Sequence, residues 1–144
     1  MGTEKRTVLY DWHVAQGANM ASFGGYEMPL WYKAGARKEH LAVIEAAGVF
    51  DTSHMALLTI TGEKSFEVLQ KTFTKDLDQC LGPQKKPLAV GRCVYGMFLN
   101  ETGHVVDDAI VYKIHDKMFM LVVNAGMGPV ISTHLEQHGI DSGI

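Results

Sequence analysis

The chain has 144 residues, enough for one domain of ordinary size or for a piece of a larger protein. Hydrophobic residues make up 47% and charged residues 20%, a composition that excludes a disordered chain. The net charge of −3 and the absence of a basic cluster argue against nucleic acid as the main partner. No apolar run is long enough to span a membrane, and the first residues lack the apolar core of a signal peptide. Cys80 and Cys93 fit neither a metal spacing nor a disulfide framework, so the cytoplasm is the expected compartment.

The first third of the chain contains little periodicity. Residues 6–32 are rich in aromatic residues and glycine, which predicts an irregular arm that wraps a core. The alternative is that residues 23–29 shape part of a pocket wall. Residues 34–47 are predicted to form a helix, with Leu41 and Ile44 on one face.

The rest of the chain predicts a small α+β unit. From Ser53 to His138 the predicted order is β-α-β-β-β-α, an antiparallel sheet with helices on one side. The predicted strands cover residues 56–61, 92–100, 104–115 and 118–125, and the predicted helices cover 63–74 and 130–138. Residues 75–91 are predicted to be a loop.

The hairpin formed by residues 99–112, LNETGHVVDDAIVY, contains two adjacent carboxylates in a strand. Asp is rare in strands, and successive side chains point to opposite faces. Asp107 therefore shares a face with Ala109 and Val111, and Asp108 shares the other with Ile110. A carboxylate among apolar neighbours must be paired or hydrogen-bonded. One interpretation is structural: an edge strand in which one Asp is solvated and the other is hydrogen-bonded to a nearby backbone N–H. The other is that one carboxylate awaits a basic ligand.

Other groupings that could indicate chemistry are weaker. His134 and His138 are spaced i, i+4, as zinc ligands can be, but HLEQH matches no known zinc motif, and no metal site is predicted. Ser53 and His54 are adjacent in sequence, which is not how a catalytic dyad meets, and GxSxG is absent.

Four segments together resemble one known family. They are RTVLYDWHVAQGANM with FGGYEMP within residues 6–29, EHLAVIEAAGVFDTSHM at 39–55, FLNETGHVVDDAIVY at 98–112 and LVVNA at 121–125. In their order and spacing they resemble the N-terminal part of the glycine cleavage system T-protein, a tetrahydrofolate-dependent aminomethyltransferase. The resemblance covers roughly residues 6–138, and four motifs in register make it specific.

The resemblance implies a fold and a set of roles. The family fold has three domains around a folate channel, so residues 1–52 would begin the first domain and residues 53–144 would form most of the second, folate-contacting domain. Asp108 would be the catalytic carboxylate, and tetrahydrofolate would contact Met55, Tyr95, Val122 and Asn124. The family takes an aminomethyl group from a lipoyl carrier protein (H-protein), passes the carbon to tetrahydrofolate and releases ammonia.

Three departures from the family pattern bear on these expectations. His104 replaces a glycine at the hairpin turn, where little effect is expected, and Gly-Met-Gly-Pro at 126–129 replaces a charged run. Further folate ligands of the family lie beyond residue 144. We therefore expect no transferase turnover from the chain alone, and we expect self-association through the incomplete first domain. A related folate-dependent demethylase and a non-catalytic folate-binding module are the alternatives.

Overall fold

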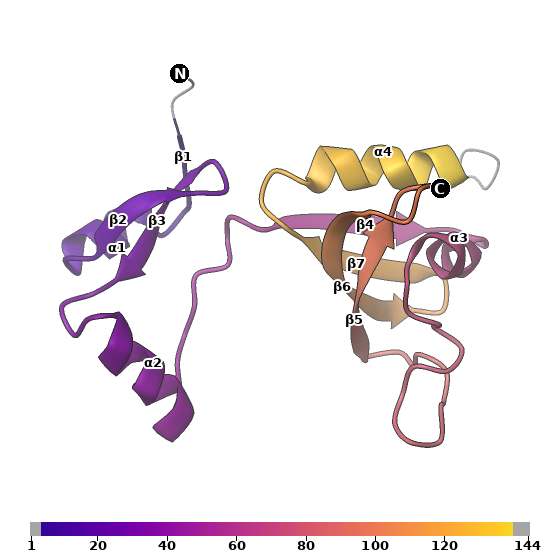
Figure 1. The fold of residues 1–144 in the computed structure, drawn as a ribbon, viewed down its shortest axis with the longest axis horizontal. Helices are drawn as coiled ribbons and strands as arrows, with labels where there is room; N and C mark the ends of the chain where they lie inside the picture. The colour runs from indigo at the N-terminus through magenta and orange to yellow at the C-terminus, as the bar shows by residue number, and fades with distance from the viewer. Residues whose placement is uncertain (1–3, 140–144) are drawn as a thin grey trace. The chain divides into compact units, whose positions relative to one another are not determined.

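The computed structural model describes residues 4–139. Contacts within the chain divide it into two compact units, Met1–His54 and Met55–Ile144. Each unit has its own sheet and is described separately (Figure 1). None of the helices in the described part is long and apolar enough to cross a membrane.

The first unit contains more regular structure than the sequence predicted. Its elements are β1 (Lys5–Arg6), α1 (Tyr10–Ala15), β2 (Asn19–Phe23), β3 (Tyr26–Trp31) and α2 (Ala36–Glu45), and the sheet order is β1-β3-β2. The prediction of an irregular arm is therefore wrong for most of residues 6–32. Strands β2 and β3 are joined by Gly24 and Gly25, which both have positive φ, and Phe23 pairs with Tyr26. Two glycines between strands are a recognised hairpin signal, which the irregular spacing of the aromatic residues obscured.

A buried polar network holds the first unit together. The side chains of His13 and Asp51 are only 3% and 2% exposed, and Nε2 of His13 lies 2.8 Å from Oδ2 of Asp51. The hydroxyl of Thr7 donates to the same oxygen at 2.9 Å, and the Tyr32 hydroxyl lies 2.7 Å from Nδ1 of His13. The network joins α1, the end of β3 and the segment after α2. The network takes the place of a hydrophobic core, since Met28 is the only buried apolar residue among residues 4–54.

Helix α2 has no buried residue. Its apolar side chains Leu41, Val43 and Ile44 are 39%, 42% and 67% exposed, and Val49 and Phe50 beyond its end are exposed as well. The predicted helix is thus confirmed, two residues shorter at each end than its predicted range of 34–47. Its apolar face is not covered by the described residues of its own unit.

The second unit confirms the predicted α+β fold. Its elements are β4 (Ala56–Thr61), α3 (Ser65–Thr72), β5 (Cys93–Leu99), β6 (Val105–His115), β7 (Met118–Val123) and α4 (Gly128–Gly139). All strand pairs are antiparallel, in the order β4-β7-β6-β5. The last strand in sequence thus inserts beside the first, and β6 and β7 occupy the centre of the sheet.

The core lies on one face of this sheet. Buried strand residues such as Phe98, Val111 and Leu121 pack with Leu69 of α3 and with Ile131 of α4. Both helices therefore cover the same face, as predicted (Figure 1). The opposite face, which we call the open face, carries half-buried and exposed side chains and presents the candidate site.

Candidate functional site

The strand register gathers the predicted site residues on the open face. Val122 of β7 pairs with Leu57 of β4 and with Ile110 of β6, and Ile110 pairs with Tyr95 of β5. These residues form one row across the sheet. The neighbouring row contains Met97 opposite Asp108, with Asn124 beside Asp108 and Met55 immediately before β4. All residues expected from the resemblance thus occupy two adjacent rows at one end of the sheet.

Asn124 bridges the two faces of the sheet at this end. Its backbone N–H donates to Oδ2 of Asp107 at 3.1 Å, and its side-chain Nδ2 donates to Oδ1 of Asp107 at 2.7 Å. The same Nδ2 donates to Oδ1 of Asp108 at 2.8 Å. One amide group therefore binds both carboxylates. These hydrogen bonds offset the free-energy cost of placing carboxylates in a sheet.

The two carboxylates differ in their surroundings. Asp107 is 8% exposed and lies on the core face with Ala109 and Val111. Asp108 is half-buried and lies on the open face, as strand alternation predicted. Asp107 is thus satisfied by a backbone and a side-chain amide, whereas Asp108 interacts with Asn124 and Tyr95 and keeps carboxylate lone pairs for other contacts.

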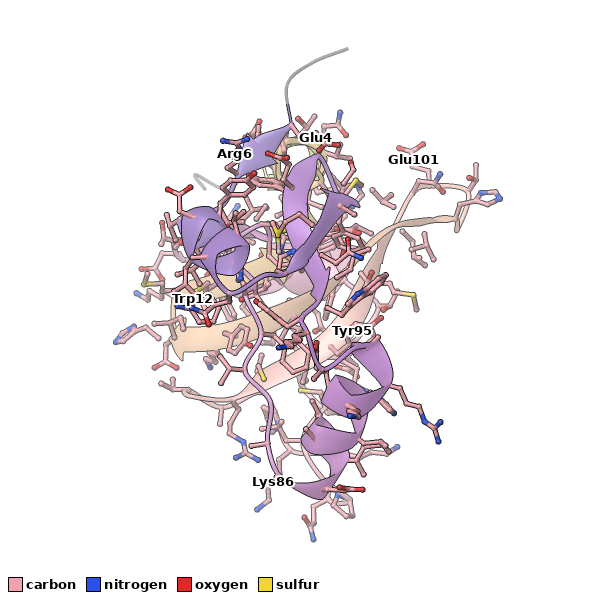
Figure 2. The ribbon with its side chains drawn as sticks, turned by 90° about the vertical axis from the view of Figure 1, so that its left-hand side faces the viewer. Glu4, Arg6, Trp12, Lys86, Tyr95 and Glu101 are labelled. Carbon is pink, nitrogen blue, oxygen red and sulfur yellow. The ribbon has the colours of Figure 1, made fainter. Side chains whose placement is uncertain are left out.

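Tyr95 is 61% exposed on the open face, in the row next to that of Asp108. Figure 2 labels its side chain. A hydrogen bond with Asp108 and the negative charge of Asp108 raise the pKa of the Tyr95 hydroxyl. The raised pKa keeps the hydroxyl protonated, so it is the donor toward Asp108. Around this polar pair the rows supply apolar surface from Met55, Met97, Leu57, Ile110 and Val122.

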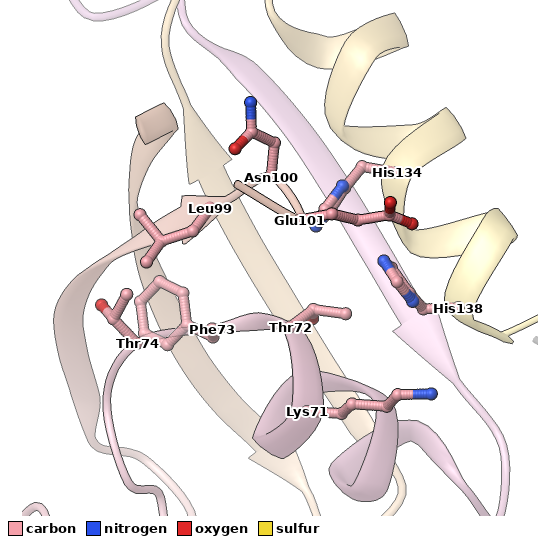
Figure 3. Close-up of a pocket in the computed structure, with 9 residues that line it drawn as sticks. All are labelled: Lys71, Thr72, Phe73, Thr74, Leu99, Asn100, Glu101, His134 and His138. Carbon is pink, nitrogen blue, oxygen red and sulfur yellow. The ribbon is translucent and has the colours of Figure 1, made fainter. Parts of the chain in front are cut away.

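A hollow of the second unit lies away from these two rows. It has a volume of about 290 Å³ and lies on the side of the sheet that the helices cover, between α3, α4 and the β5–β6 turn (Figure 3). None of the predicted site residues lines it. Its walls are Lys71, Thr72, Phe73, Thr74, Leu99, Asn100, Glu101, His134 and His138.

The histidine pair that the sequence singled out belongs to this hollow. The rings of His134 and His138 are 4.9 Å apart, and burial together with the proximity of His138 lowers the pKa of His134. Within residues 4–139 no group of three or more His, Cys, Asp or Glu side chains is arranged to hold a metal ion. On the open face the strand side chains of the second unit stay half-buried or exposed, because α3 and α4 pack on the opposite face.

Sequence reasoning missed two features of the site. Asp107 accepts a backbone N–H, that of Asn124, as the structural interpretation expects, although β6 is a central strand and not an edge strand. Its second contact, to the side-chain amide that also binds Asp108, was not predicted. Met97 was not singled out, although it is the direct cross-strand partner of Asp108. Pairing the two strands about the turn at residues 101–103 could have placed Met97 there, but the register shift between Phe98 and Leu99 changes the count by one.

Comparisons with known proteins agree with this arrangement. The family model described as the GCVT N-terminal domain matches residues 9–142. The aminomethyltransferase of Chlorobium phaeobacteroides is 42% identical over 134 residues, which cover 93% of this chain and 34% of the relative. That of Symbiobacterium thermophilum is 43% identical over 122 residues, covering 85% and 30%.

A solved structure shares the fold. The glycine cleavage system aminomethyltransferase T of Bartonella henselae matches 97% of this chain and 36% of its own, with a TM-score of 0.79 and 33% sequence identity. Fold and site together thus define a class of protein: an antiparallel α+β unit with a carboxylate on the open face of its sheet. The chain belongs to the glycine cleavage T-protein (aminomethyltransferase) family. It spans about a third of the length of the curated relatives it matches.

Proposed function

We propose that this chain forms part of a tetrahydrofolate-dependent aminomethyltransferase of the glycine cleavage system. The observation that carries the proposal is the placement of Asp108 beside Asn124 and Tyr95, with apolar side chains in the same two rows. A reduced pterin has a flat apolar face and an edge of ring nitrogens. The open face offers methionine, aliphatic and aromatic side chains for the first and a carboxylate for the second.

The residues present fit this cofactor. Asn124 uses both Nδ2 protons within the protein, so its Oδ1 is the atom of the amide left for a ligand, and Asp108 has a second oxygen. Tetrahydrofolate, when bound, supplies the nitrogens that receive the transferred carbon. Asp108 would orient those nitrogens and hold a proton near the carbon–nitrogen bond as it changes. Tyr95 would keep the carboxylate aligned.

The remaining parts of the activity involve more protein than these residues. We propose a lipoyl carrier protein (H-protein) as the partner that delivers the aminomethyl group, and the cytoplasm as the compartment. The names of the relatives support the carrier protein as partner. The free thiols of Cys80 and Cys93 agree with the cytoplasm as compartment. Because the chain spans about a third of its relatives, we expect the isolated chain to show no transferase turnover. A robust rate from it would contradict this expectation.

The test uses a version completed to the relatives' length with the matching C-terminal sequence of the Bartonella henselae protein. Ammonia release should require glycine-loaded carrier protein and tetrahydrofolate, which separates this function from a demethylase or a binding module. Asp108→Asn should lower the rate on the order of 100-fold or more, since it removes the acid–base group. Asp116→Asn is the control and should leave the rate unchanged: Asp116 lies in the β6–β7 turn, and its 75% exposed carboxylate pairs with Lys113. Equal rates in both variants would refute the role of Asp108.

A further inference from the structure

The candidate site contains the side-chain amide of Asn124, and one buried residue fixes which way its donor and acceptor ends point. A primary amide has a donor end and an acceptor end, and a half-turn about its last bond exchanges them. For Asn124 the two ends are distinguishable by their partners. Nδ2 lies 2.7 Å from a carboxylate oxygen of Asp107 and 2.8 Å from one of Asp108. A half-turn would place the amide oxygen against both carboxylates, so the observed orientation is strongly preferred.

Asp107 is the residue that makes this orientation independent of a ligand. It is 8% exposed, and it also accepts the backbone N–H of Asn124 at 3.1 Å. It therefore binds the main chain and the side chain of the same residue, on the core side of the sheet. Asp108 alone could exchange its contact with Asn124 for one with a ligand, because it lies on the open face and is half-buried.

We propose that Asp107 is a positioning residue that sets the specificity of the site for reduced over oxidised folate, an inference that rests on the proposed function. With Nδ2 turned toward the carboxylates, the site presents acceptors to its ligand, namely Oδ1 of Asn124 and the carboxylate lone pairs of Asp108 that Asn124 and Tyr95 do not use. Tetrahydrofolate carries N–H donors at both saturated ring nitrogens, N5 and N8. In folic acid the same two nitrogens are acceptors. The oxidised ring would therefore place acceptor against acceptor and leave buried polar groups unpaired.

The first experiment needs no ligand. In the ¹⁵N-labelled 144-residue chain, the side-chain amide protons of Asn124 should exchange with water more slowly than those of Asn100. Asn100 uses its Oδ1 as an acceptor in the exposed β5–β6 turn, so its amide protons are the internal reference. Equally fast exchange at the two residues would overturn the assigned orientation in the wild-type chain.

The second experiment measures discrimination. Tetrahydrofolate and folic acid are titrated separately into the same chain, and the ratio of their dissociation constants is measured by NMR. We expect the wild type to prefer tetrahydrofolate by 10-fold or more. Asp107→Asn converts one of the two accepting atoms into a donor, which allows the Asn124 amide to turn, and the preference should fall to threefold or less. Asp116→Asn is the control for loss of a β6-end carboxylate and should keep the full preference.

A second variant guards against misfolding of Asp107→Asn. Asn124→Leu removes Oδ1 while leaving Asp107 in place, and it should also lose the preference. An unchanged preference in either folded variant would overturn the proposal. If the wild type binds neither compound, the proposed function itself fails in this chain and the specificity with it. The exchange measurement, repeated on Asp107→Asn, then still decides whether Asp107 fixes the amide: faster exchange of the Asn124 side-chain protons in the variant is expected, and unchanged exchange would contradict it.

Discussion

At the scale of single residues, both units depend on a buried, hydrogen-bonded carboxylate. In the second unit Asp107 accepts from the backbone and the side-chain amide of Asn124. In the first, Asp51 binds Thr7 and His13. Breaking a buried pair costs more than the pair contributes, because the remaining partner is left without compensation. These residues are therefore the sensitive points of the molecule.

Replacing Asp51 should destabilise the first unit selectively. Asp51→Asn removes the charge that faces His13, and we expect it to lower the free energy of unfolding by about 3 kcal/mol. Both tryptophans of the chain, Trp12 and Trp31, lie in this unit, so urea unfolding followed by tryptophan fluorescence reports on it. Asp11→Asn, which alters an exposed carboxylate on α1, should cost less than 0.5 kcal/mol. Equal effects of the two variants would contradict the structural role of the network.

The same carboxylate predicts a pH dependence. Burial alone raises the pKa of Asp51, but hydrogen bonds from Ser53, His13 and Thr7 outweigh it and hold the pKa well below the ordinary value of 3.8. A folded-state pKa below the unfolded one gives stability that is present above pH 3.8 and lost as the pH falls toward the folded value. The contribution of Asp51 should thus be constant from pH 7 to about 5 and decline below about 4. The free energy of unfolding of the wild type and of Asp51→Asn, measured at each pH, isolates this contribution. The difference between the two free energies should narrow only at acid pH.

At the scale of elements, the sheet of the second unit was largely predictable. Alternation of apolar and polar residues determines which strand faces are buried. Gly103, with φ of +81°, lies in the turn of the predicted hairpin. The open-face position of Asp108 followed from the same alternation. The contact of Asn124 with both Asp107 and Asp108 did not, because it depends on the side-by-side pairing of β6 and β7 at their ends. Short-range patterns carry no information on such tertiary contacts.

Helix α2 shows a different limit. Its periodicity predicted a helix correctly, and the same apolar positions suggested a buried face. The structure leaves Leu41 and Ile44 exposed. Amphipathic patterns indicate that a face is to be covered, but they do not identify the segment that covers it.

A close approach between β5 and the segment after α3 gives a prediction at this scale. A Cβ added to Gly96 would lie 2.6 Å from Cζ of Phe73, which itself packs on Phe98. Gly96→Ala should therefore force Phe73 to shift and destabilise the second unit by about 1–3 kcal/mol, measured by urea unfolding with far-UV circular dichroism. Cys93→Ala, on the same strand but on the open face, should change stability by less than 0.5 kcal/mol. A stability of Gly96→Ala equal to the wild type would show that the core is looser than described.

At the scale of the whole molecule, the chain presents apolar surface on both units. Leu41 and Ile44 are exposed on α2, and Leu57 on the open face is 64% exposed. Exposed apolar surface of this kind favours association. The chain spans about a third of the length of its relatives. We therefore expect that these apolar surfaces are covered by protein outside the 144 residues or by a second copy of the chain.

Self-association through α2 can be measured directly. Sedimentation velocity over a 100-fold range of concentration should show a dimer or larger species that weakens in Ile44→Lys. A charge placed at a position that is buried on association is costly, so the shift toward monomer should be at least 10-fold in dissociation constant. Val90→Lys, at a 53% exposed position in the loop before β5, is the matched control. A monomer at all concentrations would exclude this mode of association.

The central claim is that the open face of the second unit binds tetrahydrofolate at Asp108. A titration of tetrahydrofolate into the ¹⁵N-labelled chain, up to millimolar concentration, tests it most directly. The account predicts chemical-shift changes at Tyr95, Asp108, Val122 and Asn124, with the amides of α4 unaffected, and their loss in Asp108→Asn. Changes confined to the hollow beside His134 and His138, or no saturable change at all, would contradict it.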